Sequence, residues 1–222
     1  MNKCIKKALF TLTILLLISI FHCSNLYAKV SYSFTGKFKT AGFNPSDPWS
    51  YGWMDTGFTT LTLFDQEVWG GIGNGREWCT TNYPWGSIWE NNTNSIINGV
   101  SPGQVALNSA YSDTPTVARW TAPSYVNLYG NTAAIDGQFF NGEAGMLVDV
   151  RINGTEIWNA VGCGSFNLIT SISPNDTIDF TVRAGSYGGG DTPLDVSISI
   201  VPEPATLLFL GLGGMFLRKR MA

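Results

Sequence analysis

Histidine is the side chain most often used for acid–base chemistry near neutral pH, and it occurs once in the 222 residues, as His22. His22 lies in an apolar N-terminal segment that we expect to be removed. The remaining chain then lacks the side chain needed for a Ser-His-Asp triad, a Cys-His pair or an imidazole zinc site. The enzymatic chemistry still open to it is that of paired carboxylates or of a metal ion held by carboxylates.

Carboxylates that could serve such chemistry occur in the second half of the chain, at Asp149, Asp176, Asp179, Asp191 and Asp195. Asp176 and Asp191 lie in predicted turns and are candidate calcium ligands, and any two of the five could form a glycosidase pair about 5–10 Å apart. An aspartate within a strand more often pairs with arginine. Arginines are available at Arg119, Arg151 and Arg183. We therefore expect structural roles for most of these aspartates and no required cofactor.

Aromatic residues are concentrated between positions 43 and 102, in a segment that is rich in glycine and asparagine and has little periodicity. Its tryptophans and tyrosines are Trp49, Tyr51, Trp53, Trp69, Trp78, Tyr83, Trp85 and Trp89. Large flat rings can stack on the apolar faces of sugars. Trp49, Trp53, Trp85 and Trp89 are our candidates for a polysaccharide-binding platform. The alternative is that these rings fill the ends of the core and fix long loops.

The N-terminus has the layout of a secretory signal peptide. A basic start with Lys3, Lys6 and Lys7 precedes an apolar run over residues 8–21 and a small residue, Ala28. The run is short for a span of about 20 residues, so we expect signal peptidase to cleave after Ala28. The alternatives are a retained anchor or lipidation at Cys23.

Two cysteines, Cys79 and Cys163, remain once Cys4 and Cys23 leave with the signal peptide. Outside the cytoplasm two remaining cysteines tend to pair, so they are a candidate disulfide. A bridge closing this long loop would contribute roughly 4–5 kcal/mol in the chain-entropy model. The alternative is two buried free thiols.

The C-terminus has three parts: Pro202-Glu203-Pro204, an apolar segment over residues 205–217, and the basic triplet Arg218-Lys219-Arg220. This order resembles the PEP-CTERM sorting signal that exosortase recognises in Gram-negative bacteria. The resemblance implies transient anchoring in the inner membrane, processing by exosortase, and a final location at the cell surface or in the extracellular matrix. The alternative is a plain tail anchor, which also places the body outside the cytoplasm.

The predicted body, residues 29–200, is acidic. It contains seven basic and fifteen acidic residues, and seven minus fifteen gives a net charge of −8. Nucleic-acid binding requires a clustered basic surface, so nucleic acid is excluded as the partner.

The body has the pattern of an all-β domain. Alternating or β-branched runs predict strands over residues 30–39, 59–64, 117–120, 135–140, 146–152, 156–158, 166–171, 177–184 and 194–200. Asn153-Gly154 predicts a type I′ hairpin turn. We expect long loops with one or two strands over residues 43–102, and helices only in the flanking segments: a signal helix at the N-terminus and a hydrophobic sorting helix at the C-terminus. An antiparallel β-sandwich of the jelly-roll type closes such a set of strands.

The second half of this body also carries a family resemblance. Residues 117–123, 176–182 and 194–196 are similar to the "RWTAP … DFxV … LDV" pattern of jelly-roll domains in exported proteins of environmental bacteria. Such domains resemble carbohydrate-binding modules in layout. The resemblance implies a non-enzymatic surface or matrix protein that binds polysaccharide or serves a structural role. The alternative is an extracellular glycan-acting hydrolase that uses paired carboxylates.

Overall fold

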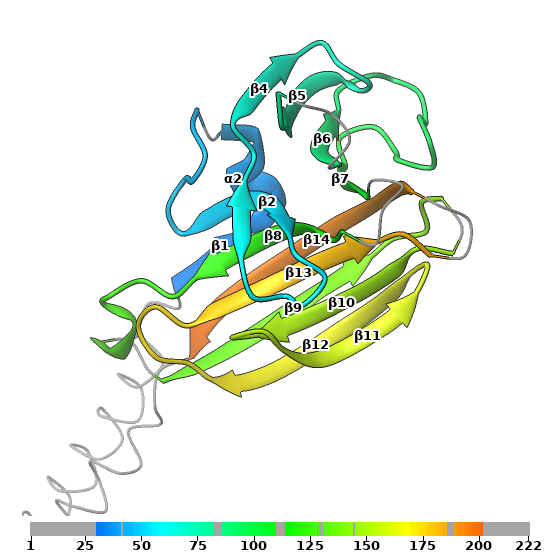
Figure 1. The fold of residues 1–222 in the computed structure, drawn as a ribbon. Helices are drawn as coiled ribbons and strands as arrows, with labels where there is room; N and C mark the ends of the chain where they lie inside the picture. The colour runs from blue at the N-terminus through cyan, green and yellow to red at the C-terminus, as the bar shows by residue number, and fades with distance from the viewer. Residues whose placement is uncertain are drawn as a thin grey trace, which may run out of the picture.

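The protein folds into two antiparallel β-sheets that pack face to face (Figure 1). The structure is a computed structural model that describes residues 30–40, 42–81, 86–109, 114–128, 131–143, 145–185 and 189–201. The predicted all-β sandwich is confirmed.

The larger sheet is built around the long strand β14. Its order is β12 (Gly164–Ser171), β9 (Thr132–Phe139), β14 (Gly190–Val201), β7 (Val105–Ser109), β6 (Ser87–Asn91), β5 (Asn74–Cys79) and β4 (Gln66–Trp69), and β1 (Val30–Ser33) also pairs with β14. The first four residues of β14 pair with β7, whereas the rest of the strand pairs with β9. In Figure 1, β4 and β5 therefore lie at the opposite end of the molecule from β12.

The six-stranded sheet positions most of the side chains discussed below. Its order is β11 (Thr155–Val161), β10 (Leu147–Ile152), β13 (Thr177–Arg183), β8 (Thr116–Thr121), β2 (Trp49–Met54) and β3 (Leu61–Leu63). Between β10 and β11, Asn153 and Gly154 have φ angles of 49° and 80°. Two consecutive positive φ angles are what a type I′ turn requires, so the sequence placed this hairpin correctly.

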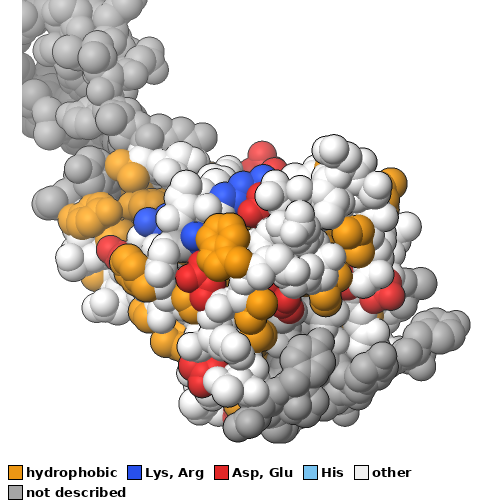
Figure 2. All heavy atoms as spheres, turned by 90° about the horizontal axis from the view of Figure 1, so that it is seen from above, with side chains coloured by type: hydrophobic (Ala, Val, Ile, Leu, Met, Phe, Trp, Pro, Cys, Tyr) orange, Lys and Arg blue, Asp and Glu red, His pale blue; other side chains and the backbone are white. Residues whose placement is uncertain are grey.

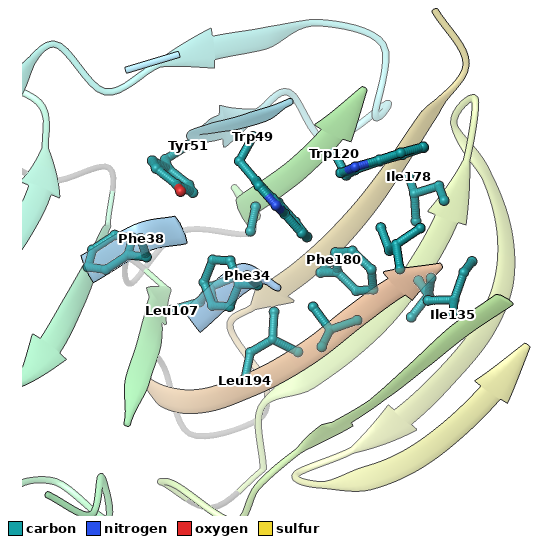
Figure 3. Close-up of a cluster of buried hydrophobic side chains, with 14 of the residues drawn as sticks. Phe34, Phe38, Trp49, Tyr51, Leu107, Trp120, Ile135, Ile178, Phe180 and Leu194 are labelled. Atoms are coloured by element: carbon teal, nitrogen blue, oxygen red, sulfur yellow. The ribbon is translucent and has the colours of Figure 1, made fainter. Parts of the chain in front are cut away.

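The core consists of the inward-facing side chains of both sheets. Its largest fully buried members include Trp49, Trp120, Phe34, Phe139 and Phe180, and Figure 3 shows several of them gathered between the sheets. Most ring pairs are tilted or edge to face, for example Trp49 against Phe180 at 6.0 Å between centroids, and Phe166 stacks on Phe180. Burial of each such side chain contributes about 1.5–3 kcal/mol, so this aromatic layer is the main attachment between the sheets.

The predicted strand over residues 30–39 is wrong in its second half. Strand β1 ends at Ser33, and residues Phe34–Thr40 form the helix α2. The hydroxyl of Ser33 accepts the backbone N–H of Gly36 at 3.1 Å, which caps the start of the helix. Phe34 and Phe38 are four residues apart, so a helix places both rings on the buried face, whereas their even spacing also fitted a strand.

The prediction of long loops with one or two strands over residues 43–102 is also wrong, because this segment contains the five strands from β2 to β6. The strands are short, and several are buried along nearly their whole length, with five of six residues buried in both β2 and β5. A strand that is covered on both faces lacks the polar–apolar alternation by which strands are recognised in a sequence.

Both predicted targeting segments lie outside the described residues. They are the signal peptide with its cleavage site at Ala28, and the C-terminal segment with sorting residues 202–204 and 218–220 and a predicted membrane helix over residues 205–217. Within the described part of the chain, no helix is long and apolar enough to cross a membrane.

Candidate ligand-binding groove

The tryptophans predicted to bind sugars are mostly core residues. Trp49 is 1% exposed and Trp89 is 0% exposed, so neither ring is available to a ligand, and the prediction is wrong for both. Trp49 packs against Phe34 as well as Phe180. Trp53 is half-buried against the core, and Trp85 lies outside the described residues. The expected alternative, that large rings fill the interior, holds for Trp49 and Trp89.

The structure does not bring the two candidate calcium ligands together. Asp176 lies before β13 and Asp191 at the start of β14, at opposite ends of the sandwich. Asp176 accepts the backbone N–H of Ser173 at 2.7 Å and Nδ2 of Asn153 at 2.9 Å. Asp191 is fully buried and also accepts N–H donors. Both carboxylates therefore serve as hydrogen-bond acceptors within the fold, and calcium binding by either residue stays a prediction.

The candidate disulfide is absent, because Cys79 and Cys163 are both free. Cys79 is buried in β5, whereas Cys163 is exposed in the turn before β12. Five strand spacings separate β5 from β12 in the sheet order, which is about 24 Å along the sheet. A disulfide requires Cα atoms within about 7 Å. Sequence separation alone could not show this distance.

A row of alternating charges crosses the outer face of the six-stranded sheet. The strand register places Arg119 beside Asp179, Asp179 beside Arg151, and Arg151 beside Glu156, on four neighbouring strands. Arg119 donates from Nε to Oδ1 of Asp179 at 2.6 Å and from Nη2 to Oδ2 at 2.9 Å. The expected pairing of strand aspartates with arginine is therefore confirmed, and this pair has the bidentate geometry of the strongest such contacts.

Arg151 is held by three acceptors. Its Nε donates to Oδ1 of Asp149 at 2.8 Å, its Nη2 to Oε2 of Glu156 at 3.0 Å, and its Nη1 to the carbonyl oxygen of Gly154 at 3.1 Å. Nε of Arg183 lies 3.9 Å from the other oxygen of Asp149. Burial raises the pKa of Asp149 in spite of these arginines, since the carboxyl group is removed from water. The guanidinium of Arg151 is thus fixed in position.

The loop over residues 55–60, between β2 and β3, folds back across this charged row. In Figure 1 it crosses in front of β13, and the carbonyl oxygen of Phe58 comes close to Gly154. The ring of Phe58 lies over the Arg151 guanidinium, with 3.5 Å between the guanidinium carbon and the ring centroid. Phe58 has a φ angle of 56°, in the left-handed region that bulky side chains avoid. Strained residues of this kind cluster at ligand sites, which makes Phe58 a candidate functional residue.

Asp55 fixes the loop that carries Phe58. Its Oδ1 accepts the backbone N–H groups of Thr59 at 2.8 Å and Thr60 at 3.0 Å, and its Oδ2 accepts the Thr59 hydroxyl at 2.6 Å. These hydrogen bonds favour the ionised carboxylate and lower the pKa of Asp55 below its ordinary value.

A groove of about 560 Å³ opens beside the Phe58 ring. Its lining residues offer an aromatic ring, a guanidinium, an amide and several hydroxyls, and they are Gly57, Phe58, Thr59, Arg119, Asn153, Gly154, Thr155 and Thr177. None of these eight residues is acidic. The nearby carboxylates of Asp149 and Asp179 are at most 1% exposed and paired with arginine. This arrangement can hold a ligand rich in hydroxyl groups, and none of the eight lining residues carries a carboxylate.

Sequence reasoning missed Phe58 and the groove. The only local signal was the sequence of residues 55–60, in which an aspartate precedes a glycine, a phenylalanine and two threonines. That pattern predicts a turn, because aspartate readily bonds backbone N–H groups a few residues ahead. It does not show that the turn folds back over the sheet.

Comparison with protein families identifies one part of the chain: residues 201–220 match the PEP-CTERM protein-sorting motif. This confirms the resemblance seen in the C-terminal sequence, and the motif indicates an exported protein that is sorted to the cell envelope or surface of Gram-negative bacteria. A comparison with curated proteins finds no match.

Three solved structures overlap parts of the sandwich. A family 35 carbohydrate-binding module from Clostridium thermocellum has 10% identity and a TM-score of 0.31, covering 47% of this chain and 84% of that one. A CBM35 from Paenibacillus barcinonensis has 16% identity and a TM-score of 0.26, covering 41% and 76%. Pika GITRL has 15% identity and a TM-score of 0.26, covering 40% and 74%.

Proposed function

We propose that this chain is an exported, non-enzymatic polysaccharide-binding protein of the bacterial surface or extracellular matrix, and that the groove beside Phe58 holds the glycan. The observation that carries the proposal is the Phe58 ring, which is held in a strained conformation on Arg151 at the edge of an open, hydroxyl-lined groove. The sorting motif supports it, because export takes the protein to where such polysaccharides are.

The chemistry of the groove favours an uncharged sugar. Asp179 neutralises Arg119, and Asp149 and Glu156 surround Arg151, so the arginines do not form an anion site. The apolar C–H face of a sugar ring can pack on Phe58, while sugar hydroxyls exchange hydrogen bonds with residues such as Thr155 and Thr177. A glycan combines these apolar and hydroxyl surfaces in one ligand.

The carboxylates near the groove support binding rather than hydrolysis. A glycosidase needs one carboxyl group to protonate the leaving oxygen and another to act as base or nucleophile. Asp149 and Asp179 are buried in ion pairs with arginine, Glu156 also pairs with arginine, and Asp55 and Asp176 accept hydrogen bonds from backbone N–H groups. Each of these carboxylates would have to give up its present partners to act on a glycosidic bond.

Binding can be tested with the full-length chain, purified in a mild non-ionic detergent, against immobilised hydroxyethyl cellulose, xylan, galactomannan and the producing strain's own extracellular polysaccharide. Phe58→Ala should weaken binding to the recognised polysaccharide at least about tenfold, because the stacking surface is removed. Phe43→Ala is the matched control, since Phe43 is 64% exposed and does not line the groove, and it should bind as the parent does.

Two outcomes would contradict the proposal: no binding to any of these polysaccharides, or equal affinity for the parent and the Phe58→Ala variant. Thermal unfolding of both variants checks that the fold is intact. Release of reducing sugar from the bound polysaccharide, abolished by a single aspartate or glutamate substitution, would support the hydrolase alternative.

A further inference from the structure

Trp69 is unlike the other described tryptophans because its ring is mostly in solvent. It is 64% exposed, whereas Trp49, Trp78, Trp89 and Trp120 are each at most 5% exposed and Trp53 and Trp158 are half-buried. Trp69 ends β4, the outermost strand of the larger sheet. Its indole is therefore a flat apolar surface that is open to a ligand.

The Trp69 ring is supported from one side by a fixed cation. Arg76 is its cross-strand partner on β5, and the guanidinium carbon lies 4.9 Å from the ring centroid. Arg76 is only 7% exposed, forms an ion pair with Glu67 at 2.8 Å and donates from Nη1 to the carbonyl oxygen of Phe38 at 2.8 Å. The cation–π contact therefore orients the indole before any ligand arrives, so little side-chain entropy is lost on binding.

The surroundings of Trp69 fit a sugar better than an apolar protein partner. Two ion pairs lie on the same side of the sheet, Arg76 with Glu67 and Lys39 with Glu90 at 3.3 Å. Figure 2 shows apolar side chains on this face interspersed with charged ones rather than gathered in one continuous area. Protein interfaces favour a contiguous apolar patch. A glycan instead stacks one sugar ring on one aromatic side chain, and its hydroxyl groups form hydrogen bonds with charged side chains nearby.

Trp69 and the Phe58 groove are on different sheets and share no residue. The groove is on the outer face of the six-stranded sheet, whereas β4 is at the far edge of the larger one. In Figure 1, β4 lies well away from β10 and β13, which support the groove. A chain bound at one surface therefore leaves the other open.

We propose that the protein is bivalent: Trp69 stacks on a pyranose ring of a second glycan strand, so one molecule cross-links two polysaccharide chains. This inference rests on the proposed function of the Phe58 groove. Cross-linking gives the protein a mechanical role in a surface layer that a single site cannot provide. It also raises binding to a dense polysaccharide surface above the affinity of either site alone.

The test is bridging between two populations of beads, one fluorescent and one magnetic, coated with the polysaccharide that the full-length protein binds. The parent should pull fluorescent beads down with magnetic ones. Trp69→Ala should abolish bridging and weaken binding to densely coated beads by about 100-fold, while still binding soluble oligosaccharide through the groove. Trp69→Phe should retain part of the bridging, and Ile169→Ala, a change at a 74% exposed residue of β12, should retain all of it.

The outcomes separate the two proposals. If the parent binds polysaccharide but does not bridge beads, or if Trp69→Ala bridges as well as the parent, bivalency is overturned and the groove proposal stands. If the parent binds no polysaccharide, the proposed function itself fails. Analytical ultracentrifugation adds a further criterion: a parent dimer that becomes a monomer in Trp69→Ala would make Trp69 a self-association surface and overturn its role as a glycan site.

Discussion

The indole Nε1–H of Trp89 donates a hydrogen bond of 2.6 Å to Oδ1 of Asp191, and both side chains are fully buried. The contact joins β6 to β14 across 102 positions of the sequence. Asn98 and Asn108 each donate from Nδ2 to the same carboxylate, at 2.9 and 2.8 Å. A residue predicted to bind sugar and a residue predicted to bind calcium thus hold each other in place, which makes both of them structural.

Asp191→Ala should therefore destabilise the fold strongly. Removing the carboxylate leaves the buried indole N–H of Trp89 without an acceptor, which costs about 1–3 kcal/mol, and it also removes the hydrogen bonds from Asn98 and Asn108. Urea unfolding at neutral pH measures the loss. Asp136→Asn, at an exposed position of the neighbouring strand β9, is the control and should change stability by less than about 0.5 kcal/mol. Equal stability of the two variants would show that the network contributes little.

The support that Asp55 gives to the Phe58 loop should persist down to about pH 4 and decline below it. Asp55 holds the Phe58 loop in its ionised form, and its pKa lies below the ordinary value of 3.8 because Thr59 and Thr60 donate to it. A lowered pKa means that the stabilisation is complete above the ordinary value and is lost as pH falls through the lowered one. Measuring the affinity for the glycan from pH 7 to pH 3 tests this prediction.

Asp55→Ala tests the same loop without acid, and it should weaken binding several-fold at pH 7 because the three hydrogen bonds to Thr59 and Thr60 are gone. Asp47→Ala, an exposed aspartate outside the groove, is the control. If Asp55→Ala binds the glycan as tightly as the parent at pH 7, the assignment of Asp55 as the support of Phe58 is contradicted.

Ionisation of the buried Glu77 carboxyl group should make the fold less stable as pH rises. Burial raises its pKa above the ordinary value of 4.5, and the charge of Asp191 adds to the effect. The folded state therefore keeps the proton longer than the unfolded state, and stability falls as pH rises from the ordinary pKa through the raised one. Glu77→Gln removes this titration, so its stability relative to the parent should increase from pH 4 to pH 7 in urea unfolding. The prediction is contradicted if the stability of Glu77→Gln relative to the parent stays constant with pH or is greatest at pH 4.

The two body cysteines should differ in reactivity. Cys163 is exposed, whereas Cys79 is buried, and burial together with the charges of Glu77 and Asp65 raises the pKa of its thiol. Because the thiolate is the reactive form, a maleimide at pH 7 should label Cys163 in the folded protein and Cys79 only after unfolding. Peptide mapping by mass spectrometry identifies the labelled residue. If both thiols become reactive only after reduction, a disulfide is present and the structure is contradicted.

The sorting motif should determine release from the membrane. Replacing Pro202, Glu203 and Pro204 together by alanine should leave the uncleaved chain in the inner membrane, since exosortase acts on the motif that these residues begin. Membrane fractionation and intact-mass analysis of the released protein measure this, with the exposed Pro102→Ala as the control. Normal release of the triple variant would refute exosortase processing.

Much of the fold could be read from local patterns. The later strands alternate or are β-branched, and the hairpin at Asn153 and Gly154 has the residues that its two positive φ angles require. The pairing of Asp179 and Asp149 with arginine also followed from residue type. The helix that contains Phe34 and Phe38 could not be predicted from the sequence, because a spacing of four residues suits a strand as well as a helix. Only packing of both rings into the core selects the helix.

The sequence by itself determined the all-β class of the body, its acidity and the sorting motif, because these depend on composition and on short contiguous runs. The tertiary structure decided which rings meet solvent: Trp49 and Trp89 became core, while Trp69 and the groove beside Phe58 became surface. Exposure depends on strand register, sheet order and the loop that folds back over the sheet, which join residues far apart in the chain. No local pattern encodes those contacts.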